Sequence, residues 1–183
     1  DYWVLYTMEA MAISPEKLDA GLVCFYLFNI VHLKEGEGIF QDAGIPHAYL
    51  RGQNVELMAC SDNVIRGGLT PKYVDIVELL KIVDCREVTP KIISVTPQNQ
   101  SEFTYKTPVN DFALAQIRVE PEMHTKVNLQ SAGILLVMQG ELKIQEKSTA
   151  LTLKQGESAF ITADSNVEIM SEKGGYAFLA KLP

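Results

Sequence analysis

The residues of this sequence best suited to chemistry gather in one short stretch, between positions 56 and 72. Acids, amides, hydroxyls and bases stand there among small residues: Glu56, Ser61, Asp62, Asn63, Arg66, Thr70 and Lys72. Arg66 offers a planar guanidinium fork, Lys72 a point charge, and a helix that begins at Pro71 would add the positive end of its dipole. These three features predict a phosphate-binding site. A plainer interpretation, which composition alone favours, is a Ser-Asp-Asn turn, a surface arginine and a capped helix.

The same stretch offers a group for proton transfer. Glu56 falls in the alternating run Val55–Ala59, which is typical of a strand with one face turned inward. An inward carboxylate has a raised pKa, and such a group can accept and return a proton near neutral pH. Glu56 is therefore our candidate for the general base.

Local patterns place these residues in a mainly β chain with a few helices. Trp3, Tyr6 and Ala10 share one helical face, and Ser14-Pro15-Glu16 predicts a second helix that runs to Gly21. Strand-like runs then follow between turn residues, at 22–33, 38–40, 48–50 and 55–59. One helix interrupts them at about 71–84, with Thr70 as its N-cap. We expect a connector over 86–100 and strands beyond it.

An internal repeat is the strongest structural signal. Residues 33–43 and 153–163 align at a constant offset of 120, with six identities in eleven positions. The repeat predicts a tight turn at Gly36 and at Gly156, each feeding a strand whose phenylalanine, Phe40 or Phe160, points into a barrel. We therefore expect two cupin-like jelly-roll β-barrels, the first incomplete, over residues 1–92 and 93–183.

His47 is the candidate metal ligand. Gly36, five residues, Asp42, then Gly44, two residues and His47 resemble the second motif of the cupin barrels, with Asp42 at the place of a proline. In that frame the histidine binds a metal through one ring nitrogen and is oriented through the other. Outside it, a lone histidine beside a proline is usually a loop residue.

A catalytic zinc needs three protein ligands, so one histidine is not enough. His32 lacks an HxH companion, and we expect it to be a rim or packing residue. The missing ligands are expected upstream of Asp1, or the site is inactive. In the second repeat Val167 takes the place of His47, and Val127, Leu129 and Gly133 take the other ligand places.

The second barrel is therefore predicted to bind no metal and to serve packing, substrate enclosure or association. His124 lies outside the ligand frame and is expected to be a solvated strand residue. An uncovered barrel edge would also permit self-association.

Composition excludes several classes of protein. Hydrophobic residues make up 47% and charged residues 21% of 183 residues, which is typical of a globular chain. A net charge of −7 repels a phosphate backbone, so nucleic acid is not an expected partner. The longest apolar run is roughly half of the ~20 residues that a membrane span needs. Three scattered cysteines, Cys24, Cys60 and Cys85, favour a reduced, cytoplasmic setting.

Two segments, Ala43–Gly52 and Glu56–Lys72, resemble the type I mannose-6-phosphate isomerases very closely, and residues 22–183 resemble the C-terminal half of that family more loosely. The resemblance implies a zinc-dependent aldose–ketose isomerase that interconverts mannose 6-phosphate and fructose 6-phosphate through an enediol. The resemblance implies that His47 is a zinc ligand, that Arg66 lies at the reacting end of the sugar and that Lys72 lies at its phosphate end. It also implies three pocket positions, at Glu56, Tyr49 and Asp62. Because one half is missing, we expect no activity from these 183 residues alone.

Two alternatives remain at this point. One is a non-catalytic cupin-like module that binds a sugar phosphate or regulates, without metal. The other is an iron-dependent cupin oxygenase, which needs two histidines and a carboxylate that this chain lacks.

Overall fold

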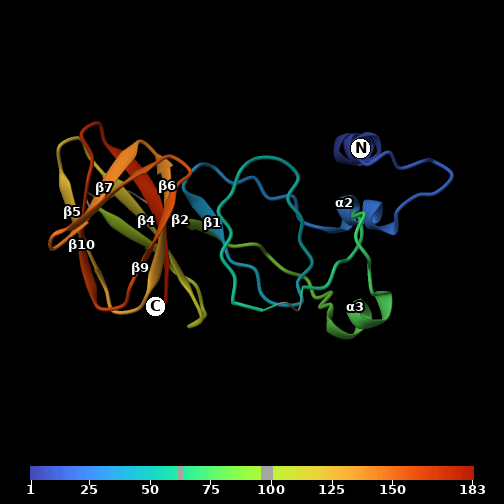
Figure 1. The fold of residues 1–183 in the computed structure, drawn as a ribbon. Helices are drawn as coiled ribbons and strands as arrows, with labels where there is room; N and C mark the ends of the chain where they lie inside the picture. Colours follow the sequence, from blue (N-terminus) through green and yellow to red (C-terminus); the bar gives the residue numbers. More distant parts are fainter. Residues whose placement is uncertain (62–63, 96–100) are drawn as a thin grey trace. The chain divides into compact units, whose positions relative to one another are not determined.

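A computed structural model describes residues 1–61, 64–95 and 101–183 of the chain. Its contacts divide the chain into two compact units (Figure 1). The first unit comprises residues 1–35, 39–55 and 60–92, and the second comprises 36–38, 56–59 and 93–183. No helix in the described part of the chain is long and apolar enough to cross a membrane.

The second unit is built from antiparallel strands in two sheets. The strands are β3 (Glu102–Tyr105), β4 (Ala113–Val119), β5 (His124–Leu129), β6 (Gly133–Gln139), β7 (Glu141–Glu146), β8 (Thr149–Lys154), β9 (Ser158–Ile161), β10 (Ser165–Met170) and β11 (Gly175–Lys181). One sheet has the order β3-β4-β11-β6-β9 and the other has the order β5-β10-β7-β8. The prediction of strands beyond the connector is confirmed.

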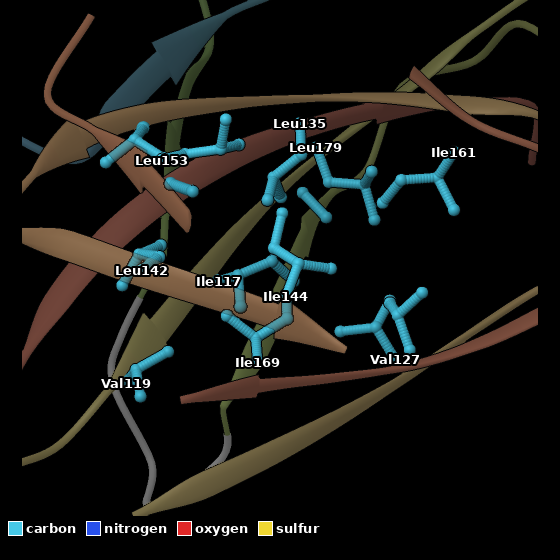
Figure 2. Packing of buried hydrophobic residues seen from close by; sticks show 14 of the residues in the cluster. Ile117, Val119, Val127, Leu135, Leu142, Ile144, Leu153, Ile161, Ile169 and Leu179 are labelled. Atoms are coloured by element: carbon cyan, nitrogen blue, oxygen red, sulfur yellow. The ribbon is translucent and has the colours of Figure 1, made fainter. Parts of the chain in front are cut away.

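Alternating apolar residues build the core between these two sheets. Strand β5 shows the period most clearly, since Thr125, Val127 and Leu129 are buried while the residues between them are exposed. Figure 2 shows side chains from both sheets meeting, among them Leu135 and Leu179 from one sheet and Ile169 from the other. The mainly β architecture is thus confirmed, although the sheets found in the described residues do not close into a barrel.

The repeat is confirmed at its turns and wrong at Phe160. Gly36 and Gly156 have nearly the same left-handed backbone, with φ of +83° and +84°, which favours glycine at both turns. Phe160, however, is 68% exposed, because the alternation of β9 turns its neighbour Ile161 into the core instead. Strand β9 pairs with β6, whereas β1 (Glu37–Ile39) pairs with β2 (Ile92–Ser94).

The first unit is mostly turns and short helices. Its helices are α1 (Tyr2–Ala10), η1 (Ala20–Val23), α2 (Cys24–Leu27) and α3 (Ile76–Ile82). Among its described residues only Gly21 and Leu22 are buried. Hydrogen bonds between distant segments therefore help to stabilise this unit. One of them runs from the side-chain amide of Asn29 to the backbone carbonyl of Val88.

Several predictions for this unit are wrong. Runs 22–33, 48–50 and 55–59 contain no strand in the described structure, and 22–27 form helical turns instead. A short apolar run does not show whether its residues follow the period of a strand or that of a helix. A strand also needs a partner strand. The helix expected over 14–21 is absent there as well, since Asp19 caps η1 at Gly21.

Helix α3 exists but is shorter than predicted. It begins after Asp75, whose carboxylate accepts a hydrogen bond from the Glu78 amide at 3.0 Å, and not after Thr70. The Thr70 hydroxyl instead accepts the Lys72 amide at 3.2 Å in a local turn. The expected helix N-terminus beside Lys72 is therefore wrong, and its dipole contributes nothing to a phosphate site there.

Candidate active site

His47 lies on an exposed loop of the first unit. Its ring Nδ1 is 3.0 Å from the carbonyl oxygen of Ile45. Because a carbonyl can only accept, the neutral tautomer that fits this contact carries its proton on Nδ1 and its lone pair on Nε2. The ring of Tyr49 stands edge-on to the imidazole, with the two ring centres 6.1 Å apart. The local backbone thus occupies Nδ1 and leaves Nε2 as the ring nitrogen available to a metal.

The residues just after α3 anchor the segment that leads into His47. The carbonyl of Gly44 accepts the Asp84 amide at 2.8 Å. Gly44 has φ of +78°, and a Cβ there would stand 2.8 Å from the carbonyl oxygen of Ile82, so glycine is required on both counts. Asp42, which departs from the cupin motif, forms an ion pair with Arg86 at 3.1 Å.

A second anchor follows Tyr49. The guanidinium of Arg51 donates to the Tyr2 hydroxyl at 2.5 Å, which raises the pKa of Arg51. The central carbon of the Arg51 guanidinium also lies 5.2 to 5.7 Å from the ring centres of Tyr2, Trp3 and Tyr6. The aromatic side chains of α1, among them Trp3 and Tyr6 of the predicted face, therefore hold Arg51 and, through it, the loop after His47.

Arg66 and Lys72 also belong to the first unit, where Arg66 is half-buried and Lys72 exposed. Between them, Leu69 donates its amide hydrogen to the carboxylate of Asp19, at 3.2 Å. The role of Asp19 is not predictable from the helix expected over residues 14–21. An aspartate two residues before a glycine, at the start of a helical turn, was the available signal.

Two of the predicted site residues are not placed relative to His47. Glu56 belongs to the second unit and is exposed, so the inward orientation expected for it is wrong, and Asp62 lies outside the described residues. The roles of Glu56 and Asp62 therefore remain predictions. His32 is exposed, so the packing role considered for it is wrong.

The second repeat carries packing residues in the ligand places, as predicted. Val167 and Val127 are buried and face each other across the β10–β5 pair. Leu129 is buried beside Gly133, where a Cβ would come within 2.6 Å of the Leu129 side chain. His124 is exposed, and its Nδ1 lies 3.2 Å from the Glu168 carboxylate.

Comparisons with known proteins decide the family. Residues 101–173 match the family model of the mannose-6-phosphate isomerase cupin domain. The mannose-6-phosphate isomerase of Escherichia coli (strain K12) is 42% identical over 149 residues, which is 81% of this chain and 38% of that protein. The enzyme of Macaca fascicularis is 36% identical over 159 residues, 82% of this chain and 38% of that protein.

A solved structure agrees with these relatives. The crystal structure of mannose 6-phosphate isomerase from Salmonella typhimurium, bound to its substrate and to zinc, matches with a TM-score of 0.79. The match has 36% sequence identity and covers 98% of this chain and 44% of that one. The chain belongs to the mannose-6-phosphate isomerase family. It spans 38% to 44% of the length of these relatives, in agreement with the resemblance to the C-terminal half of the family.

Zinc suits the donor chemistry of His47, but the described residues do not complete a site. Imidazole nitrogen is a common zinc ligand, and its second nitrogen is held here by a backbone carbonyl, as zinc-binding histidines require. Yet no group of three His, Cys, Asp or Glu side chains in the described part of the chain could hold a metal ion. A zinc site that uses His47 therefore needs ligands from outside these residues.

Proposed function

We propose that this chain forms part of a zinc-dependent mannose-6-phosphate isomerase and contributes His47, Arg66 and Lys72 to its site. The reaction interconverts mannose 6-phosphate and fructose 6-phosphate through an enediol. The observation that carries the proposal is the fold match, over 98% of this chain, to a relative bound to its substrate and zinc. The oriented imidazole of His47 supports it independently.

Each proposed residue has a distinct task. Glu56 moves a proton between C1 and C2 of the sugar, and Arg66 stabilises the negative charge that develops on the sugar oxygen. Lys72 binds the phosphate, while Tyr49 and Asp62 line the pocket. Zinc, when bound, supplies a further positive charge that stabilises an oxyanion.

The test compares two cationic residues in an isomerase that carries this sequence. Arg66→Ala should lower kcat about 100-fold or more, because loss of one oxyanion-stabilising group costs about 3 kcal/mol. Lys72→Ala should act mainly on KM, because a phosphate is bound similarly in the ground and transition states. Lys173→Ala, in an exposed turn of the second unit, is the matched control and should change neither constant.

A neutral Arg66→Ala would contradict the assignment of Arg66. Zinc analysis of the same enzyme separates the isomerase from the alternative, a metal-free module that binds a sugar phosphate. Stoichiometric zinc that is lost in His47→Ala supports the isomerase. Binding of mannose 6-phosphate by a zinc-free enzyme without turnover supports the module.

We further propose a cytoplasmic location. The three cysteines are free in this structure, which suits a reducing compartment.

We also propose self-association through an uncovered sheet edge. Strands β9 and β8 are edge strands of the two sheets and offer unpaired backbone groups. A sedimentation measurement that finds only monomer over a wide concentration range would contradict the association.

A further inference from the structure

One carboxylate joins two distant parts of the first unit. Oδ1 of Asp19 accepts the Gly21 amide at 2.7 Å, and Oδ2 accepts the Leu69 amide at 3.2 Å. These contacts bring η1 to a loop fifty residues further along the chain. Both oxygens of a single half-buried side chain are therefore used on backbone N–H groups.

The segments joined by this contact are closely packed. Gly21 and Leu22 are the only buried residues in its described part. A Cβ on Gly21 would stand 2.9 Å from Cγ of Leu69, and a Cβ on Gly68 would stand 3.1 Å from Oδ1 of Asp19. No side chain larger than hydrogen fits between these segments without a shift.

The loop held by Asp19 has a backbone that needs such a restraint. Gly68 has φ of +133° and Leu69 has φ of +47°. The left-handed backbone at Leu69 costs free energy, because a residue with a side chain rarely adopts it. Gly67 and Gly68 connect Leu69 to Arg66, and two successive glycines have wide conformational freedom. Without a fixed Leu69, nothing in these glycines would hold Arg66 in one place.

We propose that Asp19 is a positioning residue that holds the Arg66–Lys72 loop in its working conformation by fixing the amide of Leu69. The inference rests on the proposed function for the roles of Arg66 and Lys72. The contact itself stands on the geometry of Asp19, Gly21 and Leu69 alone.

A charged side chain is needed because two donors converge on it. Asparagine has nearly the same size but only one oxygen, so in Asp19→Asn one amide would face an NH₂ group and lose its acceptor. Asp75 provides the matched control, since its carboxylate accepts the Glu78 amide in an ordinary helix cap. Asparagine caps as well as aspartate, so Asp75→Asn should be nearly silent.

Amide hydrogen exchange in the 183-residue chain tests the contact directly. In the wild type the Leu69 amide should exchange more slowly than the amides of Gly67 and Gly68. Asp19→Asn should accelerate exchange at Leu69 about tenfold, while Asp75→Asn leaves it unchanged. Fast exchange at Leu69 in the wild type, or no change in Asp19→Asn, would overturn the contact, and the wild-type measurement decides even if the variant fails to fold.

Kinetics of an isomerase that carries this sequence test the positioning role. Asp19→Asn should lower kcat about tenfold with a smaller change in KM, and it should have almost no further effect in an Arg66→Ala background. An equal loss of kcat in both backgrounds would show a merely structural role and overturn the proposal. If Arg66→Ala alone has no effect, the proposed function fails, whereas exchange at Leu69 still decides the contact.

Discussion

Replacing Val167 with histidine tests whether the second unit can bind metal at the place equivalent to His47. Val167 is 5% exposed and lies on β10, directly opposite Val127 of β5. Its side chain belongs to the core cluster that both sheets share, together with Ile169. The equivalents of the other ligand places, Leu129 and Gly133, offer no donor side chain for a metal.

The expected result is a loss of stability without metal binding. An imidazole without partners in this core costs about 1–3 kcal/mol for its unsatisfied polar atoms. Its larger volume adds about 1–3 kcal/mol of overpacking. The total, about 2–6 kcal/mol, is a large share of the roughly 5–15 kcal/mol that stabilises an ordinary domain.

The loss should grow in acid. Burial disfavours the charged imidazolium, so the folded-state pKa of the new histidine lies below its unfolded value of about 6.5. The unfolded state then binds more protons, and the free energy of unfolding falls as pH drops below about 6.5.

Urea unfolding of the 183-residue chain, with and without zinc, measures both effects. Asn166→His is the matched control, because position 166 is the exposed neighbour on the same strand and its side chain points to the opposite face. Zinc that raises the unfolding midpoint of Val167→His but not of Asn166→His would refute the reasoning. So would an unchanged midpoint in the absence of zinc.

Two further groups give testable expectations. Burial raises the pKa of Tyr105, whose hydroxyl donates to the Gly36 carbonyl at 3.0 Å. The folded state thus keeps a proton that the unfolded state releases, so the free energy of unfolding should fall as pH rises above about 10. In unfolding measured as a function of pH, Tyr105→Phe should remove this loss of stability. Burial likewise raises the pKa of Cys24, and a thiol reagent should modify Cys24 more slowly than the exposed Cys60 and Cys85, as mapped by mass spectrometry. Equal modification rates would contradict the burial of Cys24.

The sequence by itself determined the class of fold and the family. Alternation along segments such as 124–129 predicts strands because each residue's face follows directly from a period of two. The turns at Gly36 and Gly156 were also predictable, since a left-handed backbone selects glycine whatever surrounds it. Motifs of the same local kind carried the family resemblance and singled out His47.

Tertiary structure alone decided what depends on contacts between distant residues. Whether the apolar run 22–27 becomes strand or helix depends on whether a partner strand is available, and the chain winds into η1 and α2 there. The direction of Phe160 depends on the register of β9 against β6, which a repeat of residue types does not fix. The Asp19 contact joins positions fifty residues apart, so no local pattern contains it. A hydrogen bond between segments is a property of their packing, and only the folded chain brings its donor and acceptor together.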